Sequence, residues 1–552
     1  MTTFSVKSWT LSSTLFNLLT AVLLVSLYNE PLWQLLLGTN QQTGWQGYLF
    51  IASFFIFLVF IFFLLLSLIS VKYLHKPLVI SLVLSAASAS YFMSSYGIVF
   101  DKTMIQNTLE TDSKEVVDLV SSAMLFNLAV FGLLPAIILG CIKVRYQSLF
   151  KECRSRIGLI ILSVIIIAAN LGLFYKDYSS TFRNKREIRN MIIPSSYIYY
   201  TAKYLSGAYE QRDTKFVEIA QDAKLGALLS NSANNTQSDV AKKLVTVIVV
   251  GETARAQNFS LNGYHKETNP ELAKLDIVNF SDTSACGTST AVSLPCMFSV
   301  LERRDFDTWQ ANNTENVLDI LKRVGFDVLW RENNSGCKGV CTRVDNQPKS
   351  FYMSEQFCEE DRCLDEILLT RLDEYMSQGD ANKVIVLHQN GSHGPSYYKR
   401  YPKAFEKFTP TCQTADLSSC SKESIQNSYD NSIVYTDFFL AQVVKYLAER
   451  SESYDSAMLY MSDHGESLGE NNIYLHGLPY YMAPDTQKKV PFITWLSQGY
   501  KERLKINQEC LVEKSNETLT HGNLFHSVLG LLDVQTKAYS SGKDIFASCR
   551  NP

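Results

Sequence analysis

The 552-residue chain has little net charge and no internal repeat. It carries 51 Lys and Arg against 54 Asp and Glu, a formal charge of −3, so it gives no sign of the basic patch that a nucleic-acid partner normally requires. Charge is also scarce in the first 175 or so residues, which contain long apolar runs. Beyond about residue 240, charged and polar residues alternate with short apolar strings, as in a water-soluble domain. This division predicts at least two structural units.

Five apolar stretches are long enough for membrane helices, which need about 18 or more mostly apolar residues. We place them at 11–28, 48–71, 78–100, 122–142 and 157–175. Ser and Ala dilute the third stretch, but small residues suit helix–helix contact in a bilayer. The alternative is a set of buried helices in a soluble protein, and it would need five such runs in succession. An N-terminal α domain of five transmembrane helices is therefore predicted.

Lys and Arg in the short loops set the orientation of these spans. The loop after the second span holds Lys72 and Lys76, whereas the first loop, about 29–47, has neither Lys nor Arg. Five basic residues follow the fourth span: Lys143, Arg145, Lys151, Arg154 and Arg156. An inside N-terminus and five spans place everything after residue 175 outside the cytoplasm. The first span has no evident small-residue cleavage site and four spans behind it, so we do not treat it as a signal peptide.

Cysteine usage agrees with that topology. Of 12 cysteines, Cys141 and Cys153 lie at the predicted inner side. The other ten lie in the outward part, mostly in close pairs, and in an oxidising compartment this predicts disulfides: Cys286, Cys296, Cys337, Cys341, Cys358, Cys363, Cys412, Cys420, Cys510 and Cys549. Sequential pairing would give four short loops and one longer one, although the sequence does not fix the connectivity. The alternative is a thiolate zinc site at a close pair, which suits an oxidising compartment poorly.

The middle of the chain connects the two kinds of segment. Residues 101–121 form a polar loop that faces outward. In 176–242, basic residues precede aromatic and aliphatic ones, which fits either an interfacial helix or an amphipathic connector packed on the soluble domain. Residues 230–239 have the composition of a flexible linker.

From Lys243 the pattern is that of an α/β domain. Helical patterns at 316–324 and 428–450 separate short apolar runs, and this alternation predicts a mainly parallel sheet sandwiched by helices. The predicted strands are 243–251, 326–330, 383–388, 456–463 and 490–496. In such sheets, ligands bind beyond the carboxyl ends of the strands.

Acidic and His side chains follow these strands directly. Glu252 follows the first strand and could complete most of a tetrahedral zinc site with the Asp463–His464 pair. Single histidines such as His388 or His521 are usually structural. However, five of the eight histidines fall in or beside Gly-containing strand-exit loops, and this grouping indicates a metal site.

Residues 284–299, SACGTSTAVSLPCMFS, are the candidate source of a nucleophile. The segment is rich in hydroxyls and bracketed by Cys286 and Cys296. A Thr hydroxyl is a weak nucleophile unless a base or a metal lowers its pKa. The structural alternative is a helix start at which Thr288 or Ser289 caps the backbone. Both interpretations can hold, because a helix N-terminus also offers donors to a phosphoryl oxygen.

Five strings together resemble the lipid A phosphoethanolamine transferases, a family that includes the transferable colistin-resistance enzymes and belongs to the alkaline phosphatase and sulfatase superfamily. These strings are GETARAQNFSLNGY, CGTSTAVSLPCMFS, NNSGCKGVC, HQNGSHGPSYYKRY and SDHGESLGENNIYLHG. The resemblance runs over essentially the whole chain. It implies a transmembrane domain at 1–175, bridging helices and a linker at 176–242, and a periplasmic catalytic domain of the superfamily's α/β type at 243–552.

The resemblance also implies site residues. The family's zinc ligands correspond to Glu252, Thr290, Asp463 and His464, with Thr290 as nucleophile. Residues near the phosphate or a second zinc correspond to Lys338, His393, Glu466 and His476, with Asn334 and Ser335 beside the Lys. In IQNTLETDSKE, the donor-lipid contacts correspond to Asn107, Thr111 and Glu115.

The implied enzyme is a monomeric inner-membrane protein with at least one tightly bound Zn²⁺. It moves phosphoethanolamine from phosphatidylethanolamine to a phosphate of lipid A through a phosphoethanolamine-threonine intermediate, which implies polymyxin resistance. A core sugar or another glycan as acceptor, and a membrane-anchored phosphodiesterase, remain open. A sulfatase would need Pro two residues after its Cys or Ser and then Arg, and neither Cys286 nor Cys296 has that sequence. A phosphoglycerol transferase fits the motifs less well, and a degenerate sensor would lack ligands that are present here.

Overall fold

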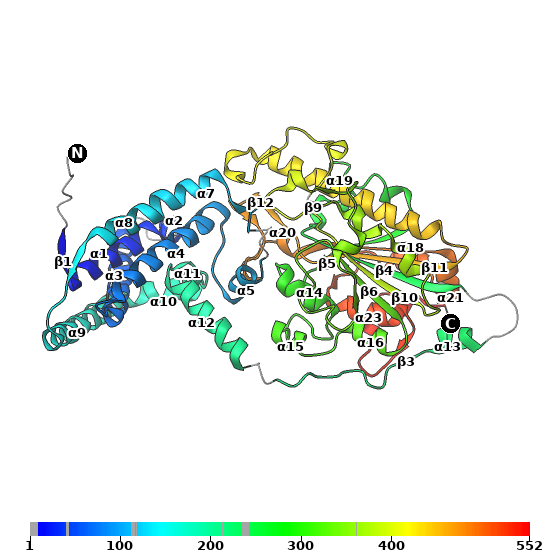
Figure 1. The fold of residues 1–552 in the computed structure, drawn as a ribbon, viewed down its shortest axis with the longest axis horizontal. Coiled ribbons are helices and arrows are strands. Elements are labelled where there is room, and N and C mark those ends of the chain that lie inside the picture. The colour runs from blue at the N-terminus through cyan, green and yellow to red at the C-terminus, as the bar shows by residue number, and fades with distance from the viewer. Residues whose placement is uncertain are drawn as a thin grey trace. The chain divides into compact units, whose positions relative to one another are not determined.

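The computed structural model divides the chain into two compact units (Figure 1). One unit comprises Met1–Ile105 with Val120–Tyr204, and the other comprises Gln106–Leu119 with Leu205–Pro552. The structure describes residues 9–39, 44–111, 116–117, 119–210, 214–234, 242–359 and 362–551.

The first unit is built from apolar helices. Four of them are long and apolar enough to cross a membrane, namely Trp45–Ile69, His75–Tyr96, Ser122–Cys141 and Phe150–Leu173. A fifth candidate is the pair Ser13–Leu27 and Glu30–Gly38, bent by 59°. The described part of the chain thus contains four to five candidate spans where the sequence predicts five. The helices described between residues 13 and 210 are, in order, α1 (Ser13–Leu27), α2 (Glu30–Thr39), α3 (Trp45–Ile69), α4 (His75–Tyr96), α5 (Lys102–Glu110), α7 (Ser122–Asn127), the π-helix η1 (Leu128–Leu133), α8 (Leu134–Cys141), α9 (Leu149–Leu173), α10 (Tyr175–Asn184), α11 (Ile188–Met191) and α12 (Ser195–Glu210).

The last apolar helix begins earlier than predicted. The sequence pattern places Lys151, Arg154 and Arg156 in a loop, but α9 already starts at Leu149. Glu152 lies in its first turn, where the partial positive charge of a helix N-terminus favours an acid. One turn later Arg156 pairs with Glu152 at 3.2 Å, an i,i+4 contact that stabilises a helix. The helix therefore extends beyond its apolar run into the basic segment.

The second unit is organised around an eight-stranded sheet of order β15-β5-β14-β11-β4-β10-β6-β7. Five of its seven strand pairings are parallel, and those of β14 with β11 and with β5 are antiparallel. The predicted, mainly parallel sheet is confirmed. Its strands are β4 (Lys243–Gly251), β5 (Ile277–Ser284), β6 (Asp327–Glu332), β7 (Asp345–Asn346), β10 (Lys383–His388), β11 (Tyr454–Ser462), β14 (Lys489–Leu496) and β15 (Leu519–Thr520).

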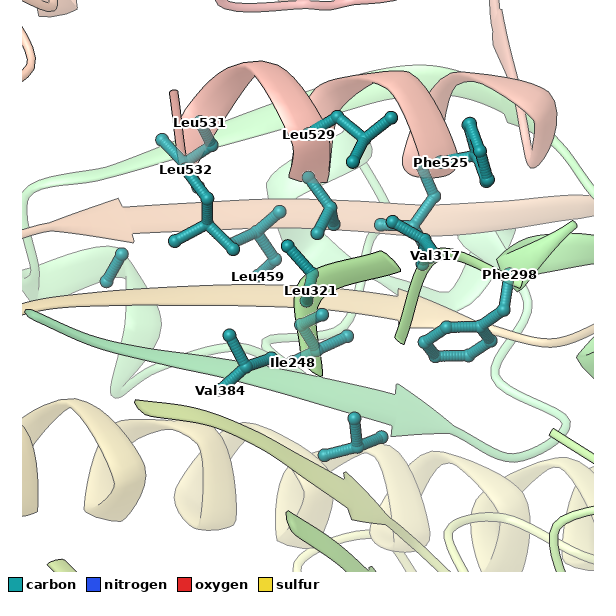
Figure 2. Packing of buried hydrophobic residues seen from close by; sticks show 14 of the residues in the cluster. Ile248, Phe298, Val317, Leu321, Val384, Leu459, Phe525, Leu529, Leu531 and Leu532 are labelled. Atoms are coloured by element: carbon teal, nitrogen blue, oxygen red, sulfur yellow. The ribbon is translucent and has the colours of Figure 1, made fainter. Parts of the chain in front are cut away.

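Helices cover both faces of this sheet. On one face, α14 (Thr290–Phe298), α16 (Val317–Arg323) and α23 (Gly522–Leu531) bury their apolar side chains in one core with alternate residues of the strands. Figure 2 shows Phe525 and Leu529 of α23 above Ile248 and Leu459 of the sheet. The long α19 (Lys422–Ala448) lies on the opposite face (Figures 1 and 2).

Two local differences from the sequence pattern have simple causes. The strand β5 escapes prediction because polar Asn, Ser and Asp interrupt its apolar residues and only part of it is buried. The helix α19 begins at Lys422, six residues before the predicted start, because Ser421 caps its first turn by accepting a hydrogen bond from the Ser424 N–H. Such side-chain caps extend helices beyond their apolar pattern.

Five disulfides join the outward cysteines in sequence order. The pairs are Cys286–Cys296, Cys337–Cys341, Cys358–Cys363, Cys412–Cys420 and Cys510–Cys549. Four close short loops and one a loop of 39 residues, as sequential pairing predicts. The Cys337 and Cys341 sulfurs bond each other, so this pair is a disulfide and not half of a zinc ribbon.

The core beneath α23 can be tested with two identical substitutions. Val528 is fully buried in α23 and Val512 is 52% exposed in α22 (Gln508–Glu513). We expect Val528→Ala to lower the free energy of unfolding by about 2–3 kcal/mol, because it removes buried methyl groups and leaves a cavity. Val512→Ala should change it by no more than about 0.5 kcal/mol. Chemical unfolding of the detergent-solubilised protein measures both, and equal effects would contradict this description of the core.

Candidate metal and nucleophile site

Four neighbouring parallel strands bring their carboxyl ends to one edge of the sheet. In the order β11-β4-β10-β6, these ends lead into Asp463 and His464, Glu252, the loop that carries His393, and Asn334. The carboxyl ends of parallel strands all lie at the same edge of a sheet. Residues more than 200 positions apart in sequence therefore become neighbours.

Glu252, Asp463 and His464 form a compact, fully buried group whose ligand atoms all lie within 4.8 Å of one another. The His464 Nε2 lies 3.5 Å from Glu252 Oε1 and 3.4 Å from Asp463 Oδ2. The Thr290 hydroxyl joins this group: it donates to Glu252 Oε2 at 3.1 Å and lies 3.4 Å from His464 Nε2. Oxygen atoms of three residues and one imidazole nitrogen thus lie close together, and carboxylate and imidazole groups of this kind can hold a metal ion such as zinc.

The hydrogen bonds of His464 fix which nitrogen faces the group. Its Nδ1 lies 2.9 Å from the carbonyl oxygen of Gly465. Because a carbonyl only accepts, Nδ1 carries a hydrogen, and Nε2 is the nitrogen that faces the two carboxylates. A neutral imidazole oriented by its other nitrogen is the usual state of a metal-ligating His.

The carboxylates show that the group suits a cation. Glu252 Oε1 and Asp463 Oδ2 are buried and have no hydrogen-bond partner among the described residues. Burial, and then the charge of Asp463, raise the pKa of the Glu252 carboxyl. Two buried acids with unsatisfied oxygens are costly unless a positive charge compensates them. The residues therefore fit a divalent metal ion.

Local structure separates Thr290 from the other hydroxyls of its loop. Thr290 is the first residue of α14, and the Cys286–Cys296 disulfide closes the segment around it. The Thr288 hydroxyl instead donates to the Leu478 carbonyl at 2.6 Å. Thr288 therefore holds the loop against the segment after His476, while the Thr290 hydroxyl faces the carboxylates.

A second hydrogen-bonded chain borders this group. The Tyr397 hydroxyl donates to Glu466 Oε1 at 2.6 Å, and His476 Nδ1 lies 2.8 Å from Glu466 Oε2. The His476 ring centroid lies 4.4 Å from that of His464 and 5.5 Å from that of His393. Burial lowers the pKa of His476, but the charge and hydrogen bond of Glu466 outweigh it and raise the pKa overall. Glu466 therefore orients His476, and Tyr397 orients Glu466.

Most residues named from the sequence meet at one small pocket beside Thr290. It is lined by Asn107, Glu110, Thr111, Thr290, Ser335, Lys338, His393 and His476. Asn334 is one step away: its amide donates to Glu252 Oε2 at 2.5 Å. Of the expected site residues, Glu115 lies outside the described residues.

Several supporting residues carry no signal in the sequence. The buried Asp365 accepts hydrogen bonds from the backbone N–H groups of Asn390 and Gly391, at 2.8 and 3.0 Å, and from the Asn333 amide at 2.8 Å. It thereby shapes the loop before His393. Only the position of Asp365 in the folded chain identifies it.

His388 also has a structural place. It pairs with Glu332, its Nδ1 lying 3.0 Å from Oε2, and its Nε2 lies 3.3 Å from the Asn334 amide nitrogen that donates to Glu252. A buried chain of polar groups thus supports the metal group from behind.

The chain matches known proteins over both units. Residues 58–209 match the family model described as phosphoethanolamine transferase EptA/EptB, and residues 245–534 match the sulfatase model. Phosphoethanolamine transferase EptA of Escherichia coli strain K12 is 43% identical over 88% of each chain. The chain belongs to the phosphoethanolamine transferase family.

Other relatives agree with this membership. The transferase is 39% identical to phosphatidylethanolamine transferase Mcr-1 of Escherichia coli, over 84% of this chain and 85% of that protein. The solved integral membrane protein lipooligosaccharide phosphoethanolamine transferase A from Neisseria meningitidis matches 99% of this chain and all of its own, with 35% identity and a TM-score of 0.92. The transferase is thus a multi-pass membrane protein whose C-terminal domain is periplasmic.

The loop before His393 allows a test of how closely the site is packed. Gly391 has φ +53°, and a Cβ there would lie 2.7 Å from the Glu252 carbonyl oxygen. We expect Gly391→Ala to displace Glu252 and lower transferase activity roughly hundredfold, since a shift of about 1 Å can cost that much. Gly263 has φ +87° with open space around its Cβ position, so Gly263→Ala adds only backbone strain of about 1–2 kcal/mol. Activity per folded protein separates the two variants, and equal activity would show that the close approach is unimportant.

Proposed function

We propose that this transferase moves phosphoethanolamine from phosphatidylethanolamine to a phosphate group of lipid A, with Thr290 as the residue that carries the group in between. The observation behind this proposal is the Thr290 hydroxyl, which is hydrogen-bonded to a buried carboxylate at the edge of a polar pocket. The donor is supported by the relative named a phosphatidylethanolamine transferase. The acceptor class is supported by the relative named for lipooligosaccharide.

In the first step, the Thr290 oxygen attacks the donor phosphorus while its proton is held by Glu252 Oε2, 3.1 Å away. A P–O bond to Thr290 forms and the P–O bond to diacylglycerol breaks, and the departing oxygen takes up a proton. His393 and His476 both line the pocket and are the available proton donors. Lys338, in the same lining, balances the charge on the phosphoryl oxygens, a form of electrostatic stabilisation that usually contributes strongly to catalysis.

In the second step, a phosphate oxygen of the acceptor attacks the same phosphorus. The bond to Thr290 breaks and the residue is regenerated. Glu466 holds His476 through its Nδ1, so the other nitrogen is available to take a proton from the incoming group or return one to Thr290. A hydroxyl of a core sugar, or of another glycan, would react in the same way, and water would give a phosphodiesterase.

We further propose that Glu252, Thr290, Asp463 and His464 hold one Zn²⁺ tightly. Bound zinc would lower the pKa of the hydroxyl and neutralise charge on the transferring group. The unsatisfied oxygens of Glu252 and Asp463 support a cation here. His393 and His476, whose rings lie near each other, are the candidate ligands of a second zinc.

We propose a separate role for each of the three segments predicted from the sequence. Residues 1–175 anchor a monomer in the inner membrane, 176–242 join the halves, and 243–552 carry the catalytic residues. Asn107 and Thr111 line the pocket from the segment between two membrane helices, and we assign them, with Asn334 and Ser335, to substrate binding. Modified lipid A would carry less negative charge, so expression should raise polymyxin resistance.

Replacing the nucleophile tests the first step. We expect Thr290→Ala to lower the rate of phosphoethanolamine transfer by roughly 10⁴-fold or more. Alanine has no hydroxyl, so the covalent bond to phosphorus cannot form. Thr290→Ser keeps a hydroxyl and should retain part of the activity. Intact-mass measurement after incubation with donor lipid should show an added phosphoethanolamine on Thr290 in the wild type and none in Thr290→Ala.

Labelled phosphatidylethanolamine, supplied with and without lipid A, separates transferase from phosphodiesterase. Label should move to lipid A, and only a small part should appear as free phosphoethanolamine. Free phosphoethanolamine as the main product in both reactions would establish the phosphodiesterase instead. Normal lipid A modification by Thr290→Ala would remove Thr290 from the mechanism.

Zinc content tests the proposed ligands. We expect Asp463→Asn to purify with much less than one zinc per chain, since it weakens one of three charged or strongly donating ligands in a tetrahedral site. His526 is buried in α23, away from this group, and donates no ligand to it, so His526→Gln is the control and should keep its zinc. Elemental analysis of the purified variants measures this, and a full zinc content in Asp463→Asn would contradict the site.

A further inference from the structure

The pocket beside Thr290 has a chemically divided lining. Lys338, His393 and His476 supply basic groups, whereas Glu110 is the one acid among the residues that line it in the described part of the chain. Phosphoethanolamine carries charge in the same way, with a negative phosphoryl group separated by two carbons from a positive ammonium. A pocket for such a zwitterion needs an acidic group as well as basic groups for the phosphate.

The position of Glu110 is fixed relative to the nucleophile. The buried Gln106 donates from Nε2 to Glu110 Oε1 at 2.9 Å. The same nitrogen also lies 3.5 Å from the carbonyl oxygen of Ala291, the residue after Thr290. One amide thus links the Glu110 carboxylate to the helix that begins with Thr290.

The carboxylate is also in an environment that favours a cationic partner. Burial raises the pKa of Glu110, while the Gln106 hydrogen bond and the charge of Lys338 lower it. The Lys338 ammonium donates to the carbonyl oxygens of Ser335 and of Glu110 itself, at 3.1 and 3.4 Å. Lys338 is thereby held at the pocket by backbone oxygens.

Neighbouring residues supply further acceptors. Asn107 and Thr111 lie one turn apart on the same segment as Glu110 and line the pocket with it. The Thr111 hydroxyl donates to the Asn107 carbonyl at 2.6 Å, so its lone pairs remain able to accept. An ammonium group has three N–H donors, and one carboxylate, one amide oxygen and one hydroxyl match that number.

We propose that Glu110 is a specificity-determining residue that binds the ammonium group of phosphoethanolamine and so selects this head group over uncharged ones. The assignment rests on the proposed function, since it concerns the substrate of the same pocket. The phosphoryl group lies toward Thr290 and Lys338, and the ammonium lies toward Glu110, Asn107 and Thr111.

The test compares two donor lipids in Glu110→Gln and in wild type, using the full-length protein in detergent. One donor is phosphatidylethanolamine, and the other is phosphatidyl ethylene glycol, in which a hydroxyl replaces the ammonium. A hydrogen bond to a charged group is strong, so Glu110→Gln should raise KM for phosphatidylethanolamine roughly 10- to 100-fold with kcat nearly unchanged. The KM for the hydroxyl donor should change far less, so the preference between the donors should shrink.

The ratio of kcat/KM for the two donors is measured within each variant, so it does not depend on how much of the variant folds. Glu366→Gln is the matched control. Glu366 is also a half-buried acid whose pKa is raised by burial, and it accepts a hydrogen bond of 2.9 Å from the Tyr435 hydroxyl. It does not line the pocket beside Thr290. It should keep the wild-type ratio. An unchanged ratio in Glu110→Gln would overturn the assignment, whereas a wild type that transfers from neither donor would overturn the proposed function instead.

Discussion

The catalytic half of this protein depends on two acids that share a buried site. Glu252 and Asp463 follow neighbouring strands and are both fully buried, with one unsatisfied oxygen each among the described residues. Like charges in such a place repel, and removing each from water costs several kcal/mol. The site is thus unfavourable in isolation and becomes favourable when a cation is bound. The same oxygens, placed toward water, would bind a metal only weakly.

Much of the surrounding fold holds these acids in place. Asp365 shapes the loop behind Glu252 through three hydrogen bonds. Arg255, itself buried, donates to the Glu466 carbonyl and pairs with Glu470, which fixes the loop after His464. None of these residues is in the lining of the pocket beside Thr290. They keep the distances at the site constant, as preorganised catalysis requires.

The sequence predicts those features that depend on residues close together in the chain, and it misses those that depend on contacts between distant residues. The membrane helices and β4 follow from local apolar runs. The close spacing of the cysteines predicts disulfides, but only the folded chain shows which cysteines are paired. Glu252, Asp463 and His464 could be proposed as metal ligands because each stands directly after a strand or beside one that does. The choice of Thr290, which begins a helix, rests instead on the resemblance of its loop to the family. By contrast, β5 is paired mainly through long-range contacts, and its own residues are half polar. Asp365 and Tyr397 act on partners up to 69 positions away, so no local pattern marks them. Glu110 lies in the string IQNTLETDSKE, from which the sequence predicts a role only for its neighbours. Its proposed role depends on the pocket that the folded chain forms.

The connectivity of the two units has a consequence for how the protein can be divided. Residues 106–119 belong to the catalytic unit although they lie between segments of the membrane unit, so the chain passes from one unit to the other at three places along its length. A fragment that begins at Leu205 would contain Glu252, Thr290, Asp463 and His464 but not Asn107, Glu110 or Thr111. Such a fragment would keep the proposed metal ligands and the Thr290 hydroxyl, and it would lack three residues of the pocket lining. Proteolytic cleavage at a single site therefore separates the proposed nucleophile from the residues to which we assign recognition of the substrate.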